Sequence, residues 1–160
     1  DARYDVVYEQ VSIKQVKPFE LYLGRGTALL DAMGRTINET HARLSSLPEA
    51  ERPGLVAFVV VSDGEENASK EFTKGEIRRT VSRQRNDHGW RFTFLGSNQD
   101  VAQTSADMGF DPRSSAPWLM ERVGEAYMAA ADKVARLRRQ MQSRQPLDDS
   151  FTDDERRRMT

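Results

Sequence analysis

Residues 55–61, with the sequence LVAFVVV, decide the fold class of this chain. The segment is short, entirely apolar and rich in β-branched side chains, which favour β-strands. A strand that is apolar on both sides needs cover on both faces, as in a parallel sheet flanked by helices. The sequence WRFTFL at residues 90–95 predicts a second strand, and the partly alternating YDVVYEQVSI at residues 4–13 predicts another.

A helical pattern follows the apolar strand. Thr73 and Glu76 fit a capping box, so we expect a helix to begin there. It should run to about His88, with Gly89 as its end. Its apolar face is thin and consists of Ile77 and Val81, which favours a place at the edge of the sheet.

Three other segments also show helical spacing. One helix is predicted to follow Thr27, and a short helix is expected to begin at Asp100, its cap, and to end at Gly109. Residues 111–117, which follow the short helix, are expected to be irregular. A long helix is predicted over about 118–142. The apolar faces of the first and the last of these helices are Leu30, Met33, Ile37 and Leu44, and Leu119, Val123, Tyr127, Ala130, Val134, Leu137 and Met141.

Strands that alternate with helices predict an α/β fold with three layers, in which a mainly parallel, twisted sheet carries helices on both faces. A chain of 160 residues is long enough for one ordinary domain and too short for two. We therefore expect residues 1–145 to form a single domain. Residues 146–160 contain several acids and then Arg156-Arg157-Arg158, and are expected to form a solvated, charged tail.

The composition argues against several classes of protein. Lys and Arg number 24, Asp and Glu number 25, and the net charge is −1, so binding to nucleic acid or to acidic lipid is not expected. The absence of Cys excludes disulfide scaffolds and cysteine-built metal sites, and it suits a cytoplasmic protein. The two histidines, His41 and His88, are too few for a histidine-built metal site. No apolar run reaches the roughly 18 residues of a membrane span. Because the chain starts at Asp1 and not at Met, we expect it to be trimmed, processed or excerpted.

Ligands of parallel α/β sheets bind beyond the carboxyl ends of the strands. This rule points to the loops 62–67 and 96–100, which the loop 24–27 could join. Asp63 is either a turn residue after a buried strand or a ligand for a hard cation such as Mg²⁺. Thr27 by itself is best explained as a helix N-cap. The glycine pattern before Thr27 lacks the third glycine of a dinucleotide fingerprint, so nucleotide binding is not expected.

Two segments, taken in order, resemble a known family. GTALLDA at residues 26–32, followed by VVVSDGE at residues 59–65, is similar to the second and third parts of a metal-ion-dependent adhesion site. The chain thus resembles a von Willebrand factor type A (vWA) domain. The stretches SDGEEN, WRFTFLG and NQD make it similar, more narrowly, to the short type A proteins of bacteria and their phages. The resemblance covers residues 1 to about 112, and the helix after residue 118 matches only in general form.

The resemblance implies one divalent cation, Mg²⁺ or Mn²⁺, at the top of the sheet. Thr27 and Asp63 match the family's Thr and Asp ligands. An Asp-x-Ser-x-Ser segment supplies most of the coordination in the family, and the remaining position takes water or a carboxylate of the binding partner. The implied function is therefore recognition of another protein through an acidic residue, without turnover.

The chain departs from the family at the metal site, because no Asp-x-Ser-x-Ser occurs in its 160 residues. We expect it to begin near the family's third strand and to lack the first strands of the sheet. The site is then incomplete, with cation binding on the order of mM. Strand 55–61 would have an unpaired apolar edge, unless a preceding segment or a second chain supplies the missing strands or the strands pair differently.

Two other functions stay open. The chain could be a metal-independent interaction module with a degenerate site, binding through its exposed faces or its C-terminal helix. It could also be a Mg²⁺-dependent phosphoesterase that uses Asp63 and Glu65, which ranks lower because a two-metal site needs a second carboxylate cluster. A solvated, acidic helix entrance is the simpler interpretation of Glu65 and Glu66.

Overall fold

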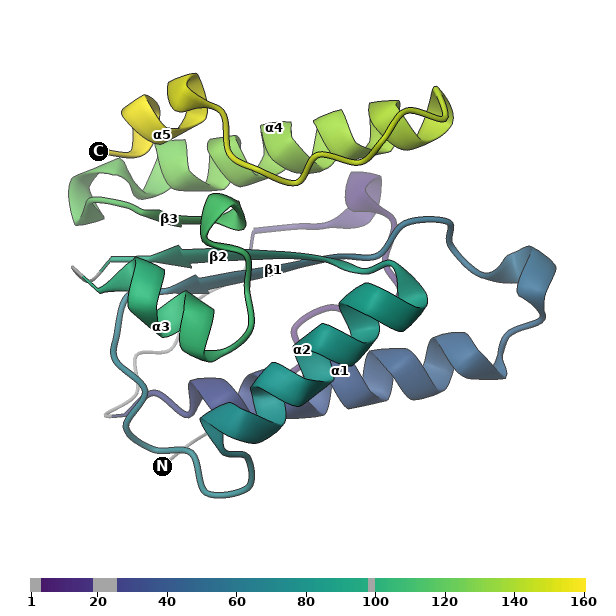
Figure 1. The fold of residues 1–160 in the computed structure, drawn as a ribbon, viewed down its shortest axis with the longest axis horizontal. Coiled ribbons are helices and arrows are strands. Elements are labelled where there is room, and N and C mark those ends of the chain that lie inside the picture. Colours follow the sequence, from purple (N-terminus) through teal and green to yellow (C-terminus); the bar gives the residue numbers. More distant parts are fainter. Residues whose placement is uncertain (1–3, 19–25, 98–99) are drawn as a thin grey trace.

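A computed structural model describes residues 4–18, 26–97 and 100–160. Within these residues the chain forms a three-stranded parallel sheet in the order β1-β2-β3, with β1 at Ala57–Ser62, β2 at Arg91–Gly96 and β3 at Ser115–Pro117 (Figure 1). The predicted α/β character and the parallel pairing are confirmed. The two strands predicted at residues 55–61 and 90–95 are present, each displaced by one or two residues.

Helices lie on both faces of this sheet. Helices α1 (Leu29–Ser46), α2 (Lys74–His88) and α3 (Val101–Asp107) lie on one face, and α4 (Val123–Gln142) and α5 (Asp153–Met159) lie on the other (Figure 1). Short 3₁₀ helices occupy Ile13–Gln15, Glu49–Glu51, Pro112–Ser114 and Met120–Arg122. In the described part of the chain no helix is both long and apolar enough to cross a membrane.

The alternation of side chains along the strands separates two apolar cores. Phe92 and Phe94 of β2, with Val60 of β1, pack with buried residues of α1, α2 and α3. Leu95 of β2 packs on the opposite face with Ala126 and other residues of α4 and the C-terminal segment. Successive strand residues thus point to opposite layers, as the pleat of a strand requires.

Helix α2 agrees with its local sequence signals. The Thr73 hydroxyl accepts a hydrogen bond from the Glu76 N–H, and the Glu76 carboxylate accepts one from the Thr73 N–H, which is a complete capping box. Gly89 ends the helix in the left-handed region with φ of 68°. The predicted place at the sheet edge is wrong: α2 packs against α1, α3 and the middle strand β2. Its thin apolar face is sufficient there, because Ile77 and Val81 are fully buried.

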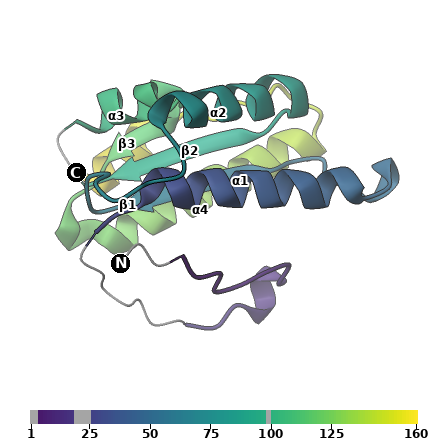
Figure 2. The same ribbon diagram turned by 90° about the horizontal axis from the view of Figure 1, so that it is seen from below.

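The strand predicted at residues 4–13 is absent. The described residues 4–12 are irregular, with no strand beside them, and Val6 and Val7 are more than half exposed. This segment lies outside the layers of helices and sheet (Figure 2). An apolar alternating pattern becomes a strand only when a neighbouring strand accepts its hydrogen bonds, so the local pattern was not sufficient.

Residues 111–117, expected to be irregular, contain β3. This strand is only three residues long and pairs with Phe94, Leu95 and Gly96 of β2. A segment this short carries too little sequence pattern to be recognised. Tertiary pairing with β2 therefore decides its conformation.

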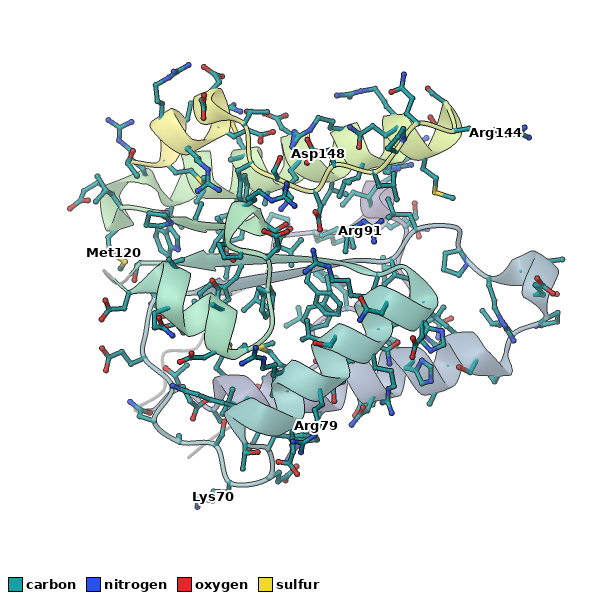
Figure 3. The ribbon with its side chains drawn as sticks, viewed as in Figure 1. Lys70, Arg79, Arg91, Met120, Arg144 and Asp148 are labelled. Carbon is teal, nitrogen blue, oxygen red and sulfur yellow. The ribbon has the colours of Figure 1, made fainter. Side chains whose placement is uncertain are left out.

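Helix α4 begins at Val123, and the predicted apolar stripe is confirmed only in part, because Ala130 and Leu137 of that stripe are buried. Its buried residues are Ala126, Ala129, Ala130, Lys133 and Leu137. Val123 and Tyr127 are 42% and 51% exposed, and Met120 before the helix is at the surface as well (Figure 3). Three alanines let the first turns of the helix approach the sheet closely, so these small side chains are buried while Val123 and Tyr127 of the predicted stripe stay exposed.

The segment 146–160 is not a solvated tail. Thr152 and Glu155 form a capping box that begins α5, and Phe151 and Met159 are buried against the sheet and α4. Arg136 of α4 donates a hydrogen bond of 2.7 Å to the buried Glu155 carboxylate. Arg156 donates to the carbonyl oxygen of Ser115 in β3. The charges of this segment therefore fasten it to the domain.

Candidate functional site

Three loops meet at the carboxyl ends of β1 and β2. The carbonyl oxygen of Thr27 accepts hydrogen bonds from the N–H groups of Asn67 and Ala68 at 3.1 and 3.3 Å. The N–H of Thr27 donates to Asn67 Oδ1 at 2.9 Å. From the third loop, the Ser97 hydroxyl donates to the carbonyl oxygen of Asp63 at 2.9 Å. The loop before α1, the loop after β1 and the loop after β2 are thus joined directly, as the rule for parallel sheets predicts.

Thr27 and the turn at Asp63 and Gly64 are in direct contact. A Cβ atom on Gly64 would lie only 2.8 Å from the Thr27 hydroxyl oxygen, so glycine is needed at this close approach. Thr27 is not the N-cap that its sequence position suggested, because Ala28 occupies the N-cap position. Ala28 makes no side-chain hydrogen bond to the first turn of α1. Within the described residues the Thr27 hydroxyl has no hydrogen-bond partner. The Asp63 side chain is exposed at the same edge.

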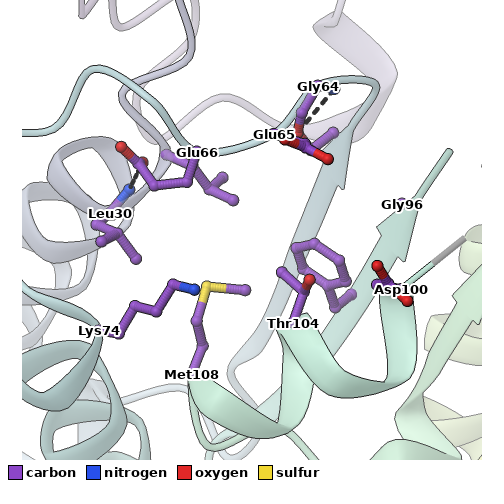
Figure 4. A pocket seen from close by; sticks show the side chains of 12 residues that line it. Leu30, Gly64, Glu65, Glu66, Lys74, Gly96, Asp100, Thr104 and Met108 are labelled. Carbon is purple, nitrogen blue, oxygen red and sulfur yellow. Dashed lines mark hydrogen bonds between the residues drawn. The ribbon is translucent and has the colours of Figure 1, made fainter. Parts of the chain in front are cut away.

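Glu66 supplies the missing cap of α1. Its carboxylate accepts a hydrogen bond from the N–H of Leu30, in the first turn of α1 (Figure 4). It also accepts hydrogen bonds from the Ser69 N–H and hydroxyl. Burial raises the pKa of Glu66, but the hydrogen bonds from Leu30 and Ser69 outweigh it and lower the pKa below 4.5. Glu66 is therefore an ionised anchor of the loop, and the expectation of a solvated acidic helix entrance is wrong for this residue.

Asp31 holds the other end of the same loop. Its carboxylate accepts hydrogen bonds from three successive N–H groups, those of Lys70, Glu71 and Phe72, at 2.8, 2.9 and 2.9 Å. Burial raises the pKa of Asp31, and these backbone donors lower it below 3.8. Together, Glu66 and Asp31 fix the loop 64–72 on the start of α1. This rigid support determines where Asp63 and Gly64 sit relative to Thr27.

A cavity of about 220 Å³ opens beside this edge, between α1 and α3. Its floor is apolar and includes Leu30, Phe94 and Met108, whereas Glu65, Lys74, Asp100 and Thr104 contribute polar atoms. Figure 4 shows Lys74 extending into this space toward Met108. Asp100, expected to cap α3, makes no side-chain capping bond and lies at the cavity instead. Thr27 and Asp63 do not line it, so the cavity and the predicted metal ligands are neighbours with separate linings.

The sequence identified Thr27 and Asp63 but not the residues that position them. Glu66 and Asp31 bond to partners 36 to 41 positions away in the chain, and no local spacing signals such pairs. Gly24, Asn98 and Gln99 of the predicted loops lie outside the described residues.

The donors at this edge suit a hard cation, since one carboxylate and one hydroxyl offer oxygen only. In the described part of the chain, no group of three or more His, Cys, Asp or Glu side chains is placed to hold a metal. Any metal at Thr27 and Asp63 would thus need further ligands from solvent or from another chain. No protein-family model matches this chain, and no curated protein or solved structure matches it either.

Proposed function

We propose that this chain recognises another protein through a divalent cation, Mg²⁺ or Mn²⁺, bound by Thr27 and Asp63 at the carboxyl edge of the sheet. The supporting observation is the contact between the unbonded Thr27 hydroxyl and the turn at Gly64, directly beside Asp63. The Thr27 hydroxyl and the turn that carries Asp63 come from segments far apart in the chain and meet there, in the order in which the resemblance to vWA domains places them. The rigid anchoring of the loop by Glu66 supports a preformed site.

A cation with one protein carboxylate keeps much of its positive charge and accepts an acidic side chain from outside. Mg²⁺ prefers near-octahedral oxygen coordination and commonly retains several waters. We propose that water, a carboxylate of the partner and an Asp-x-Ser-x-Ser segment from outside these 160 residues or from a second chain complete the coordination. The role of the protein is then binding, because one carboxylate and one hydroxyl do not form the clamp of a two-metal hydrolase.

A metal-independent interaction module is the second candidate, and a specific surface supports it. Val123, Tyr127 and Met128 of α4 are each more than 40% exposed, so they offer apolar contact area without any cation. Removal of divalent cations with EDTA separates the two proposals, because only the first one loses partner binding.

Thermal unfolding with and without cation tests the first proposal. A ligand that binds only the native state stabilises it by about 2.7 kcal/mol at a hundredfold excess over Kd. We expect Mg²⁺ or Mn²⁺ to raise the melting temperature of the wild-type chain. The shift should be absent in Asp63→Asn and reduced in Thr27→Val, which removes the hydroxyl at nearly constant volume. Glu65→Gln is the matched control, because Glu65 is an exposed carboxylate two residues from Asp63 and should keep the full shift.

Paramagnetic Mn²⁺ locates the site without any variant. It should broaden the amide NMR signals of residues 26–28 and 62–64 first. The site would be ruled out if the cation raised the melting temperature equally in the wild type and in Asp63→Asn. Broadening of NMR signals centred elsewhere in the chain would also rule it out.

A further inference from the structure

The only two histidines of the chain are in ring contact. His41 lies on α1 and His88 is the last residue of α2, and their ring centroids are 4.7 Å apart with an angle of 57° between the rings. The two helices lie side by side in both ribbon views (Figures 1 and 2). We propose that His41 and His88 form a clamp for a transition-metal ion, Zn²⁺, Cu²⁺ or Ni²⁺, between α1 and α2.

The separation of the rings agrees with joint coordination of one ion. Zn²⁺ binds imidazole nitrogen at about 2.0–2.1 Å in tetrahedral geometry, which places the centroids of two ligating rings about 5 Å apart. The observed 4.7 Å is within a rotamer adjustment of that value. The centroid separation is therefore compatible with one ion bound between the two rings.

The ring nitrogens are available for coordination. Among the described residues, neither imidazole has a hydrogen-bond or ion-pair partner, so no existing bond must break. His88 is exposed and His41 is half-buried, which gives an ion access from solvent. The helices that carry them are fixed by buried contacts, including Ile37 of α1 and Ile77 and Val81 of α2 in one core. The clamp is thus held on rigid elements, which lowers the entropic cost of binding.

The ligand type selects a class of metal different from that of the proposed cation edge. Imidazole nitrogen suits Zn²⁺, Cu²⁺ and Ni²⁺, whereas Mg²⁺ prefers oxygen. The two places are also at opposite ends of the sheet, because His88 precedes the start of β2 at Arg91 and the proposed cation edge follows its end at Gly96. The clamp does not depend on the proposed function. Two histidines, which the sequence suggested were too few for a metal site, suffice in this proposal because water completes the coordination of the ion.

Calorimetric titration of the full chain, prepared without a histidine tag, tests the clamp with Zn²⁺ as the probe. We expect one Zn²⁺ per chain, and at least a tenfold loss of affinity in His41→Ala and in His88→Ala. Asn38→Ala is the matched control, since Asn38 is an exposed residue one turn before His41 on α1 and should leave the affinity unchanged. Electron paramagnetic resonance with Cu²⁺ should report two nitrogen ligands in the wild type and one in each histidine variant.

NMR of the wild-type chain tests the clamp even if the variants fold poorly. Two histidines give two sets of imidazole signals, and Zn²⁺ should shift both at the same stoichiometry, while Mg²⁺ shifts neither. The clamp is overturned if Zn²⁺ moves only one ring or none. It is also overturned if both alanine variants bind Zn²⁺ as tightly as the wild type.

Discussion

Replacement of Asp31 by Asn tests the anchoring of the loop 64–72 on α1. The Asp31 carboxylate accepts three backbone N–H groups, two at Oδ1 and one at Oδ2. Asparagine keeps the shape of the side chain but has only one acceptor oxygen. In its best orientation the amide oxygen keeps the bonds from Glu71 and Phe72. The amide NH₂ then faces the N–H of Lys70, a donor against a donor.

The expected loss follows from these contacts. A hydrogen bond to a charged group contributes about 1.5–3 kcal/mol to stability. A carboxylate in the first turn of a helix adds about 0.3–1 kcal/mol through the helix dipole. Asp31→Asn should therefore reduce the free energy of unfolding by about 2–4 kcal/mol. Asp31 is only 8% exposed, so water cannot fully replace the lost acceptor.

Urea unfolding followed by circular dichroism measures this loss. Asp87→Asn makes the same chemical change at an exposed position near the end of α2 and should alter stability by less than about 0.5 kcal/mol. The pH dependence gives a second check. Because the folded-state pKa of Asp31 lies below its ordinary value, its contribution is full above about pH 4 and disappears as the pH falls through the folded-state pKa. The difference between wild type and variant should shrink below pH 4. A loss no larger than that of Asp87→Asn, or a difference that does not shrink as the pH falls below 4, would refute this account of the anchor.

Three further changes probe the two cores. Gln84 is fully buried, and within the described residues neither polar atom of its side chain has a hydrogen-bond partner. Gln84→Met should therefore raise the free energy of unfolding by about 1–2 kcal/mol, and a lower melting temperature would contradict this. Arg136→Met should lower the free energy of unfolding by about 2–3 kcal/mol and open the C-terminal segment to proteolysis, because it leaves the buried Glu155 carboxylate without its ion-pair partner. Adding Glu155→Gln to this variant should restore part of the lost stability. Burial lowers the pKa of Lys133 to about 8, so between pH 8 and about 10.5 the unfolded chain binds more protons and wild-type stability should rise with pH. In Lys133→Met this rise should be missing from pH-dependent urea titrations, and its persistence would assign it to another group.

The sequence was sufficient where the signal is local. Helix α2 was predicted from its first residue to its last, because a capping box and a left-handed glycine act within a few residues. The strands at residues 55–61 and 90–95 were predicted from their composition, because short segments rich in β-branched and aromatic residues favour β-strands. Their parallel order also predicted that the loop of Asp63 meets the loop after the second strand, which the structure confirms, and the loop of Thr27 joins them. That Thr27 and Asp63 bind a metal stays a prediction.

Only the tertiary structure decided which surfaces are buried and which distant groups meet. The face of α4 that packs inward combines three alanines with Lys133 and Leu137, and the space above the sheet selects it over the most apolar stripe. The segment 146–160 is charged by composition, yet its ionic groups find partners on α4 and β3 and its Phe151 finds a core. The contact between His41 and His88, and the bonds of Asp31 to the loop before α2, join residues far apart in the chain. Local propensities act over one or two turns, whereas burial and long-range hydrogen bonds depend on neighbours that exist only once the chain has folded.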